Sequence, residues 1–150
     1  NPGGNLDTVC DILDLILPEG TIVSTKDKNG EGETYTSDEE HKLEIPLSVL
    51  TNGNSASASE IFAGAVQDYG VGTLVGTTTF GKGIVQQIFP LTDGTSIKLT
   101  ISEYFTPRGR NIHGTGINPD VEVEYEYNEE DPAADNQLEK AIEIVKENGM

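Results

Sequence analysis

Cysteine, basic residues and long apolar runs are all scarce in this sequence. The 150 residues include one cysteine, so no disulfide can form within the chain. Nine Lys and Arg residues stand against 26 Asp and Glu residues, which gives a formal net charge of −17 at pH 7. Nucleic acid is therefore not an expected partner, because its phosphates would be repelled. No apolar run is long enough to span a membrane, and no signal peptide is recognisable.

The first four residues, Asn1-Pro2-Gly3-Gly4, have the composition of a turn and include no initiator methionine. From this start we expect the chain to be part of a longer protein. Its length suits one domain with a hydrophobic core. The single cysteine, Cys10, lies within an apolar pattern, which predicts a small core residue.

Helical and strand patterns alternate along the chain, which predicts an α/β fold. Apolar spacings of three and four residues predict helices, while alternation or short apolar runs predict strands. The predicted helices cover residues 5–17, 57–69 and 136–147. The predicted strands cover residues 21–25, 45–51, 73–75, 84–91, 96–105 and 121–125, with polar segments at 26–42 and 106–119. Asn29-Gly30 is a hairpin-type turn, and Asp93-Gly94 between two strands predicts a late β-hairpin.

Residues 53–60, GNSASASE, follow a predicted strand and open a predicted helix. One interpretation is a helix cap, since Ser57 and Glu60 have the spacing of a capping box. The other is catalytic, because a helix N-terminus presents free N–H groups and a partial positive charge that suit an activated serine and an oxyanion. A serine nucleophile also needs a neighbouring base, and this segment supplies none. Both interpretations stay open on this segment alone.

Residues 76–86, GTTTFGKGIVQ, place Lys82 between two glycines and before an apolar run. A lysine amine held away from water can be neutral near pH 7 and act as a general base. The simpler alternative is an exposed lysine in a turn. Gly76, Gly81 and Lys82 also approach the phosphate-binding P-loop, but Gly83 replaces its hydroxyl residue and a β-like run replaces its helix. Nucleotide binding is therefore not expected.

Together, several long stretches of the sequence resemble the C-terminal processing, or tail-specific, peptidases. They are NPGG (1–4), LPEG (17–20), NGNSASASEIFAGAVQDYG (52–70), VGTTTFGKGIVQ (75–86), FPLTDGTSIKLT (89–100) and YFTPRGRNIHGTGINPDVEV (104–123). They cover most of residues 1–123 in the order of the family. The resemblance implies a crotonase-like α/β fold with a β-β-α core and the late hairpin. It also implies a serine endopeptidase that cuts proteins near their C-termini through an acyl-enzyme.

The same resemblance assigns roles to single residues. The implied roles are nucleophile for Ser57, general base for Lys82, orienting group for Gln86, and backbone oxyanion donors for Ala58 and for Gly3 or Gly4. It implies no metal and no cofactor.

The sequence leaves the geometry of this site open. Lys82 and Gln86 would share one face of a strand, and a helical turn would also bring them together. Ser55 and Ser59 remain alternative nucleophiles, although helix geometry would aim them elsewhere.

The resemblance also predicts the organisation of the protein. Residues 1–127 are expected to form an N-terminally truncated peptidase core, and residues 128–150 an acidic linker with a C-terminal helix. A PDZ domain and a strand usually precede such a core, and neither is in this sequence. The implied partners are C-terminal segments of protein substrates and, in the full-length protein, a second copy in a homodimer. The implied location is exported or membrane-anchored, and the alternative function is an inactive peptide-binding or scaffolding module of the same fold.

Three other features of the sequence do not predict a different site. His41 and His113 do not sit in a nucleophile elbow of the G-x-S-x-G type, so a histidine base is not expected. The acidic stretch 120–131 lacks the ligand spacing of an EF-hand, which favours a solvated strand and linker over a weak calcium site. Arg108 and Arg110 either contact a substrate carboxylate or hold a surface loop, and the loop role is favoured.

Overall fold

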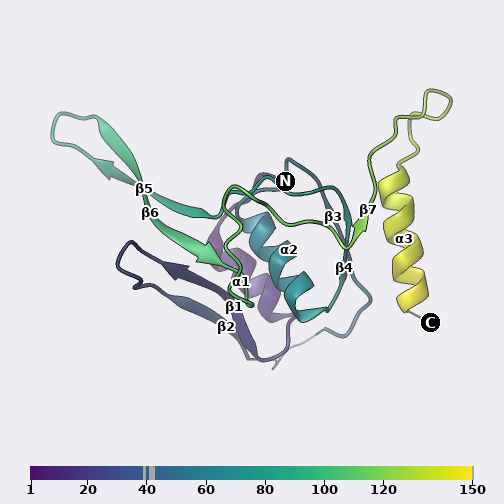
Figure 1. Ribbon diagram of the computed structural model, residues 1–150, viewed down its shortest axis with the longest axis horizontal. Helices are drawn as coiled ribbons and strands as arrows, with labels where there is room; N and C mark the ends of the chain where they lie inside the picture. The colour runs from purple at the N-terminus through teal and green to yellow at the C-terminus, as the bar shows by residue number, and fades with distance from the viewer. Residues whose placement is uncertain (39, 41–42, 150) are drawn as a thin grey trace.

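The computed structural model describes residues 1–38, 40 and 43–149, which form an antiparallel and a parallel sheet with helices packed against them (Figure 1). The helices are α1 (Leu6–Asp14), α2 (Ala58–Tyr69) and α3 (Asn136–Asn148). The strands are β1 (Gly20–Lys26), β2 (Thr34–Ser37), β3 (Ser48–Thr51), β4 (Thr73–Gly76), β5 (Ile84–Pro90), β6 (Ser96–Phe105) and β7 (Val121–Glu122).

The parallel sheet, in the order β3-β4-β7, positions the two segments singled out in the sequence. Helix α2 connects β3 to β4, because parallel neighbours need a crossover connection. Thr51 pairs with Gly76, so the two strands end side by side. The loop that leads to Ser57 leaves β3 at this end, and residues 77–83 leave β4 at the same end. The topology therefore brings the Ser57 and Lys82 segments to one edge of the sheet.

The antiparallel sheet has the order β2-β1-β6-β5. Strands β5 and β6 pair from Ile84 opposite Glu103 to Pro90 opposite Ser96. In the turn between them, the Asp93 carboxylate accepts hydrogen bonds from the backbone N–H and the hydroxyl of Thr95. The paired strands project away from the body of the molecule (Figure 1). The prediction of a late β-hairpin is confirmed.

The main core packs α1 and α2 against the sheets, with Leu13, Ile22 and Val66 almost completely buried. The Asn5 side chain caps α1 by accepting a hydrogen bond from the Thr8 N–H at 2.9 Å. Cys10 is buried in this cluster. Burial raises the pKa of its thiol to about 11. The prediction that Cys10 is a core residue is confirmed.

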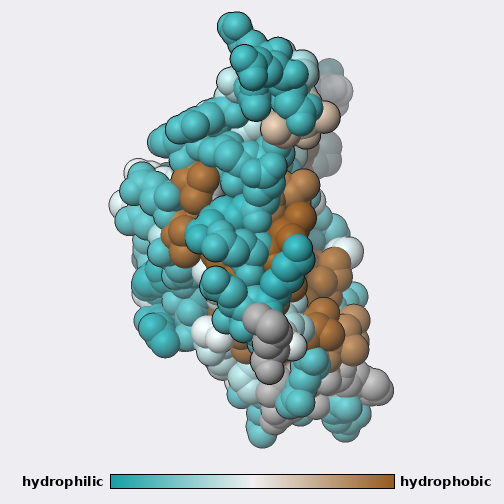
Figure 2. Space-filling model, turned by 90° about the vertical axis from the view of Figure 1, so that its right-hand side faces the viewer, coloured by the Kyte–Doolittle hydropathy of each residue, from teal (hydrophilic) through white to brown (hydrophobic). Residues whose placement is uncertain are grey.

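Helix α3 packs Ala141 and Ile144 against Val75 of β4. Figure 2 shows the face on this side of the molecule, where hydrophilic side chains dominate and apolar side chains lie in bands between them. None of the described helices is both long enough and apolar enough to cross a membrane. The division of the chain after residue 127 stays a prediction.

Three elements are shorter than their sequence patterns suggested. Helix α1 ends at Asp14, because the Leu13 carbonyl accepts from the N–H groups of both Ile16 and Leu17 and closes a tight turn. Residues 45–47 lie outside β3, where a proline without an N–H weakens strand pairing. Strand β7 is only two residues long.

Strand β2 lies inside the segment expected to be polar and irregular. The Asn29-Gly30 turn folds this segment back on β1 as a hairpin. The Asp27 carboxylate fixes the turn by accepting from the N–H groups of Asn29 and Glu31. The prediction of a hairpin-type turn was correct, but its second strand was missed because its residues are mostly polar.

Candidate active site

Ser57 stands where the loop after β3 turns into α2. Its backbone has φ 59° and ψ −120°, and it is the one non-glycine residue with positive φ in the described part of the chain. Such a conformation costs roughly 1–3 kcal/mol and is found mostly at functional sites. The turn leaves Ser57 half-buried at the helix N-terminus. The N–H of Ala58, at the first helical position, has no acceptor within the helix.

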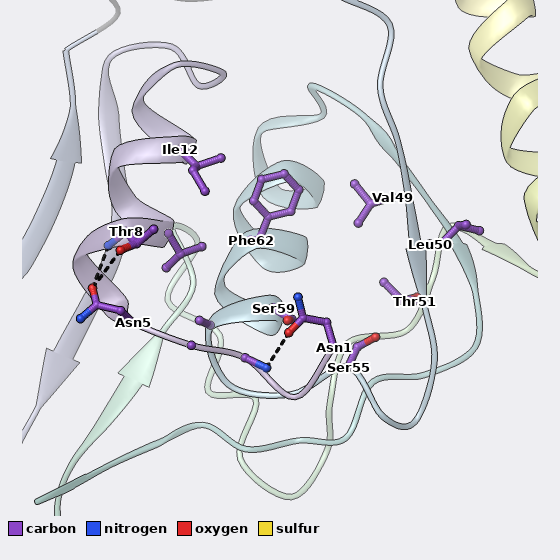
Figure 3. Close-up of a pocket in the computed structure, with 14 residues that line it drawn as sticks. Asn1, Asn5, Thr8, Ile12, Val49, Leu50, Thr51, Ser55, Ser59 and Phe62 are labelled. Carbon is purple, nitrogen blue, oxygen red and sulfur yellow. Dashed lines mark hydrogen bonds between the residues drawn. The ribbon is translucent and has the colours of Figure 1, made fainter.

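The N-terminal residues pack directly against this turn. The Ala56 N–H donates to the Asn1 carbonyl at 3.1 Å, and the Asn1 side chain accepts from the Gly3 N–H at 3.0 Å (Figure 3). A β-carbon added at Gly3, where φ is +99°, would lie 2.6 Å from the Ala56 carbonyl oxygen and 2.8 Å from Ser57 Cβ. This close approach therefore requires glycine. Because the Gly3 N–H is already paired, Gly4 is the better placed of the two glycines to donate to an oxyanion.

Glu60 joins the Ser57 turn to the Lys82 segment. Its side chain is fully buried, with 0% exposure. One carboxylate oxygen accepts from the N–H groups of Ser57 at 2.9 Å and Lys82 at 2.8 Å. The other accepts from the Thr79 hydroxyl at 2.6 Å and the Gly81 N–H at 2.7 Å. The capping-box partner expected from the sequence thus also holds the segment that carries the proposed base.

Lys82 itself is half-buried and lies just before β5. Its two glycine neighbours pack against the loop at residues 113–116. A β-carbon at Gly81 would lie 2.9 Å from the Gly116 nitrogen, and one at Gly83 would lie 2.7 Å from the His113 nitrogen. The segment continues into a strand and not a helix, which agrees with the rejection of a P-loop.

Tyr104 of β6 contacts the same segment from the opposite sheet. Its hydroxyl donates to the Lys82 carbonyl, and its backbone N–H donates to the Gly83 carbonyl at 3.1 Å. The side chain is 5% exposed. Burial raises the pKa of Tyr104 to about 12. Tyr104 therefore contacts the main chain at Lys82 and lines a cavity together with Ser57.

A cavity of about 230 Å³ collects these side chains. Its lining consists of Gly4, Leu6, Ser57, Ala58, Ile61, Lys82, Ile84, Val85, Gln86, Lys98 and Tyr104. Gln86 lies on β5, which begins at Ile84, and its Nε2 donates to Thr100 Oγ1 at 3.4 Å. Lys82 precedes this strand, so no helical turn joins Lys82 to Gln86. Within the described part of the chain, the Ser57 hydroxyl and Lys82 Nζ are not hydrogen-bonded to each other.

A separate and larger cavity, of about 440 Å³, lies between α1, α2 and β3 (Figure 3). Its apolar lining includes Val9, Ile12, Val49, Leu50 and Phe62. Ser55 and Ser59 line this cavity, whereas Ser57 lines the smaller one with Lys82. The Ser55 hydroxyl also accepts a hydrogen bond from the Asn52 N–H at 3.1 Å. The two alternative nucleophiles therefore line a different cavity from the one that Lys82 lines.

Comparison with known families identifies the chain. The model of peptidase family S41 matches residues 1–123. The chain belongs to peptidase family S41. This is a family of serine peptidases, and the resemblance read from the sequence motifs is confirmed.

The relatives of this S41 chain carry names of the same kind. It is 45% identical over 148 residues to a carboxyl-terminal-processing protease of Synechocystis, covering 97% of this chain and 35% of the relative. It is 43% identical over 124 residues to the carboxy-terminal processing protease CtpB of Bacillus subtilis, covering 82% of this chain and 26% of the relative. The chain thus spans about a third or less of the length of these relatives.

Solved structures show the same mixed α/β fold. The structure of a photosystem II D1 C-terminal processing protease matches with a TM-score of 0.79 and 33% identity, covering 97% of this chain and 36% of that protein. The tricorn protease matches with a TM-score of 0.61 and 22% identity, over 97% of this chain and 14% of that protein. At this lower identity the likeness concerns the fold alone.

The histidines and arginines of the S41 chain lie outside the small cavity or outside the described residues. His113 is exposed and His41 is not among the residues that the structure describes. Arg110 forms an ion pair with Asp68 of α2, whose carboxylate also accepts from the Arg108 N–H. The loop role favoured for these arginines agrees with this geometry. In the described ranges, no group of three or more His, Cys, Asp or Glu side chains could hold a metal ion.

Sequence analysis missed most of the polar framework around the site. Glu60 was expected only as a capping residue, and Thr79 and Tyr104 had no assigned role. The capping-box spacing was the one local signal for Glu60, and it accounts for the bond to Ser57 alone. The other partners of Glu60 lie about twenty residues further along the chain, so no short sequence pattern could predict these contacts.

Proposed function

We propose that this S41 chain carries the nucleophile and the general base of a serine endopeptidase, Ser57 and Lys82. The observation that carries the proposal is the shared cavity, in which a strained serine at a helix N-terminus meets a half-buried lysine. Glu60 supports it by binding the main chain of both residues through one buried carboxylate. Burying a carboxylate costs desolvation free energy even when four donors bind it. Such an arrangement is therefore not expected for a surface turn that has no further role.

The proposed reaction is acyl transfer to water. Lys82 Nζ accepts the Ser57 proton as Oγ attacks the scissile carbonyl carbon. The lysine then gives that proton to the departing amine as the C–N bond breaks. The acyl group stays on Ser57 as an ester. Water attacks this acyl-enzyme, releases the carboxylic acid and restores the serine. Gln86 would orient the lysine side chain from β5.

The oxyanion formed by each attack needs backbone donors. We propose the Ala58 N–H, which has no acceptor within the helix, and an N–H of the N-terminal turn. Gly4 lines the cavity with Ser57, whereas Gly3 packs against the backbone of the Ser57 turn.

Gly3→Ala is therefore expected to slow the reaction of Ser57 at least about tenfold, since an added methyl group would displace the Ser57 turn by fractions of an ångström or more. A β-carbon at Gly53 meets nothing within 4 Å and Gly53 lines neither cavity, so Gly53→Ala serves as the matched control and should keep most of the rate. The measurement is the second-order rate of labelling by a fluorophosphonate, with thermal unfolding in parallel. Equal labelling rates for wild type and Gly3→Ala would contradict this role.

The substrate is proposed to be an extended peptide near the C-terminus of a protein, as the names of the relatives suggest for those proteins. Strand β5 is at the edge of its sheet and begins two residues after Lys82. A peptide can add to such an edge as a further strand through main-chain hydrogen bonds. This placement would bring its scissile bond to the cavity.

Several finer expectations support the same proposal and belong with it. The parallel β3-α2-β4 unit is consistent with a crotonase-like core. A preceding PDZ domain, a homodimer and an exported or membrane-anchored location follow from the family resemblance. An inactive peptide-binding module is the alternative function. The absence of a hydrogen bond between the Ser57 hydroxyl and Lys82 Nζ, both in described residues, is the observation in its favour.

Covalent labelling tests the proposed nucleophile. We expect a fluorophosphonate to form one adduct, located by peptide mass spectrometry on Ser57. The Ser57→Ala variant should form none. An adduct on Ser55 or Ser59 would reassign the nucleophile, and an unreactive folded wild-type protein would favour the inactive module.

A further inference from the structure

We propose that Tyr104 is a further catalytic residue, whose hydroxyl holds the Ser57 hydroxyl in its reactive position while anchoring the main chain at Lys82. The proposal rests on the function proposed above and adds a third side chain to it. Tyr104 lines the same cavity as Ser57, Lys82 and Gln86.

The contacts of Tyr104 fix the main chain that carries Lys82. Its backbone N–H binds the Gly83 carbonyl and its hydroxyl binds the Lys82 carbonyl, so one residue fixes two successive peptide groups. Pairing with β1, where Tyr104 lies opposite Thr25, holds β6 in register from its other side. The phenol is thus buried on a rigid strand and not on a mobile loop.

The direction of the tyrosine proton decides what the hydroxyl can do for Ser57. Because that proton is donated to the Lys82 carbonyl, the phenol oxygen has only lone pairs left for other partners. Ser57 lines the same cavity, so in the proposed arrangement a hydrogen bond between the two hydroxyls has the serine as its donor. Such a bond selects one staggered rotamer of Ser57. Transfer of the serine proton to Lys82 then needs rotation of the O–H bond and not of the whole side chain.

Tyr104→Phe removes only the hydroxyl and keeps the buried ring. We expect kcat for a peptide substrate and the rate of phosphonylation to fall about tenfold, which corresponds to one hydrogen bond in the transition state. KM should stay within twofold, because binding along β5 does not use the phenol.

Tyr69→Phe is the matched control. The Tyr69 hydroxyl also donates to a main-chain carbonyl, that of Thr21, at 2.9 Å, but it lies at the far end of α2 from Ser57. Both variants should lose similar thermal stability, while only Tyr104→Phe should lose reactivity at Ser57. The proposal is overturned if Tyr104→Phe reacts within twofold of wild type, reacts faster, or slows only as much as Tyr69→Phe.

A second variant keeps the test decisive if Tyr104→Phe does not fold. Site-specific replacement of Tyr104 by 3,5-difluorotyrosine preserves the hydroxyl and the ring and lowers the phenol pKa. A phenolate cannot donate to the Lys82 carbonyl, so activity should be lost at lower pH than in wild type, and an unchanged pH profile overturns the proposal. All measurements use the whole protein, and the Ser57→Ala variant is measured in parallel. An active Ser57→Ala protein would refute the proposed function itself, whereas an inactive one with unaffected Tyr104 variants refutes only the role of Tyr104.

Discussion

Replacing Lys82 by methionine is expected to lower kcat by about 10³-fold or more while the protein stays folded. A positioned general base contributes roughly 10²–10⁴ to a rate, and serine without one is a poor nucleophile. Methionine has a similar length and fills the same space without an amine. The N–H and carbonyl of residue 82, which bind Glu60 and Tyr104, are unchanged by the substitution. The measurement is kcat and KM for a peptide substrate, with circular dichroism and thermal unfolding as the check on folding.

Lys82→Arg separates the role of a base from the role of a charge. Arginine keeps the positive charge but is not deprotonated in proteins, so it should be as inactive as methionine. Lys26→Met is the control, since Lys26 lies over the Phe105 ring on the neighbouring strand and outside the cavity. If Lys82→Arg retained most of the wild-type kcat, Lys82 would act by charge and the base would be another group.

The parts of this fold that the sequence predicted are those with local causes. The β5–β6 hairpin follows from Asp93-Gly94 between two apolar runs, and the Asp93 carboxylate stabilises that turn in the structure. Helix α2 follows from its apolar spacing. It is capped by Gly70, whose φ of 67° lies in the left-handed region that favours glycine. Each of these features depends on residues only a few positions apart.

The parts that the sequence did not predict depend on tertiary contacts. The positive φ of Ser57 is unusual for serine, and it is held by the close packing of Gly3 and by the bond from the Ser57 N–H to Glu60. Tyr104 reaches the Lys82 carbonyl because β6 has one particular register against β1 and β5. A register of this kind is set by the whole sheet. The proposed nucleophile and base were therefore paired through family resemblance, while the groups that hold their main chain were not predicted.

Glu60→Gln is expected to have the largest effect on stability, about 1–3 kcal/mol lost, together with a strong loss of reactivity at Ser57. All four hydrogen bonds to this carboxylate come from N–H or O–H donors. A glutamine amide has the same shape but offers one acceptor oxygen and one NH₂ group. Whichever way it is turned, the NH₂ group faces at least one backbone N–H donor, and a buried group left without a partner costs roughly 1–3 kcal/mol.

The loss should appear both in urea unfolding and in phosphonylation of Ser57, because the same carboxylate oxygen holds the N–H groups of Ser57 and Lys82. Glu143→Gln is the matched control, since Glu143 is exposed on α3 and pairs with Lys140, a surface ion pair worth about 0–1 kcal/mol. It should change neither measurement appreciably. Glu60 acts by position and not as a reacting group, so the residual folded Glu60→Gln protein should still be labelled on Ser57, only more slowly. Wild-type stability and labelling in Glu60→Gln would show that the two segments are held together by other contacts.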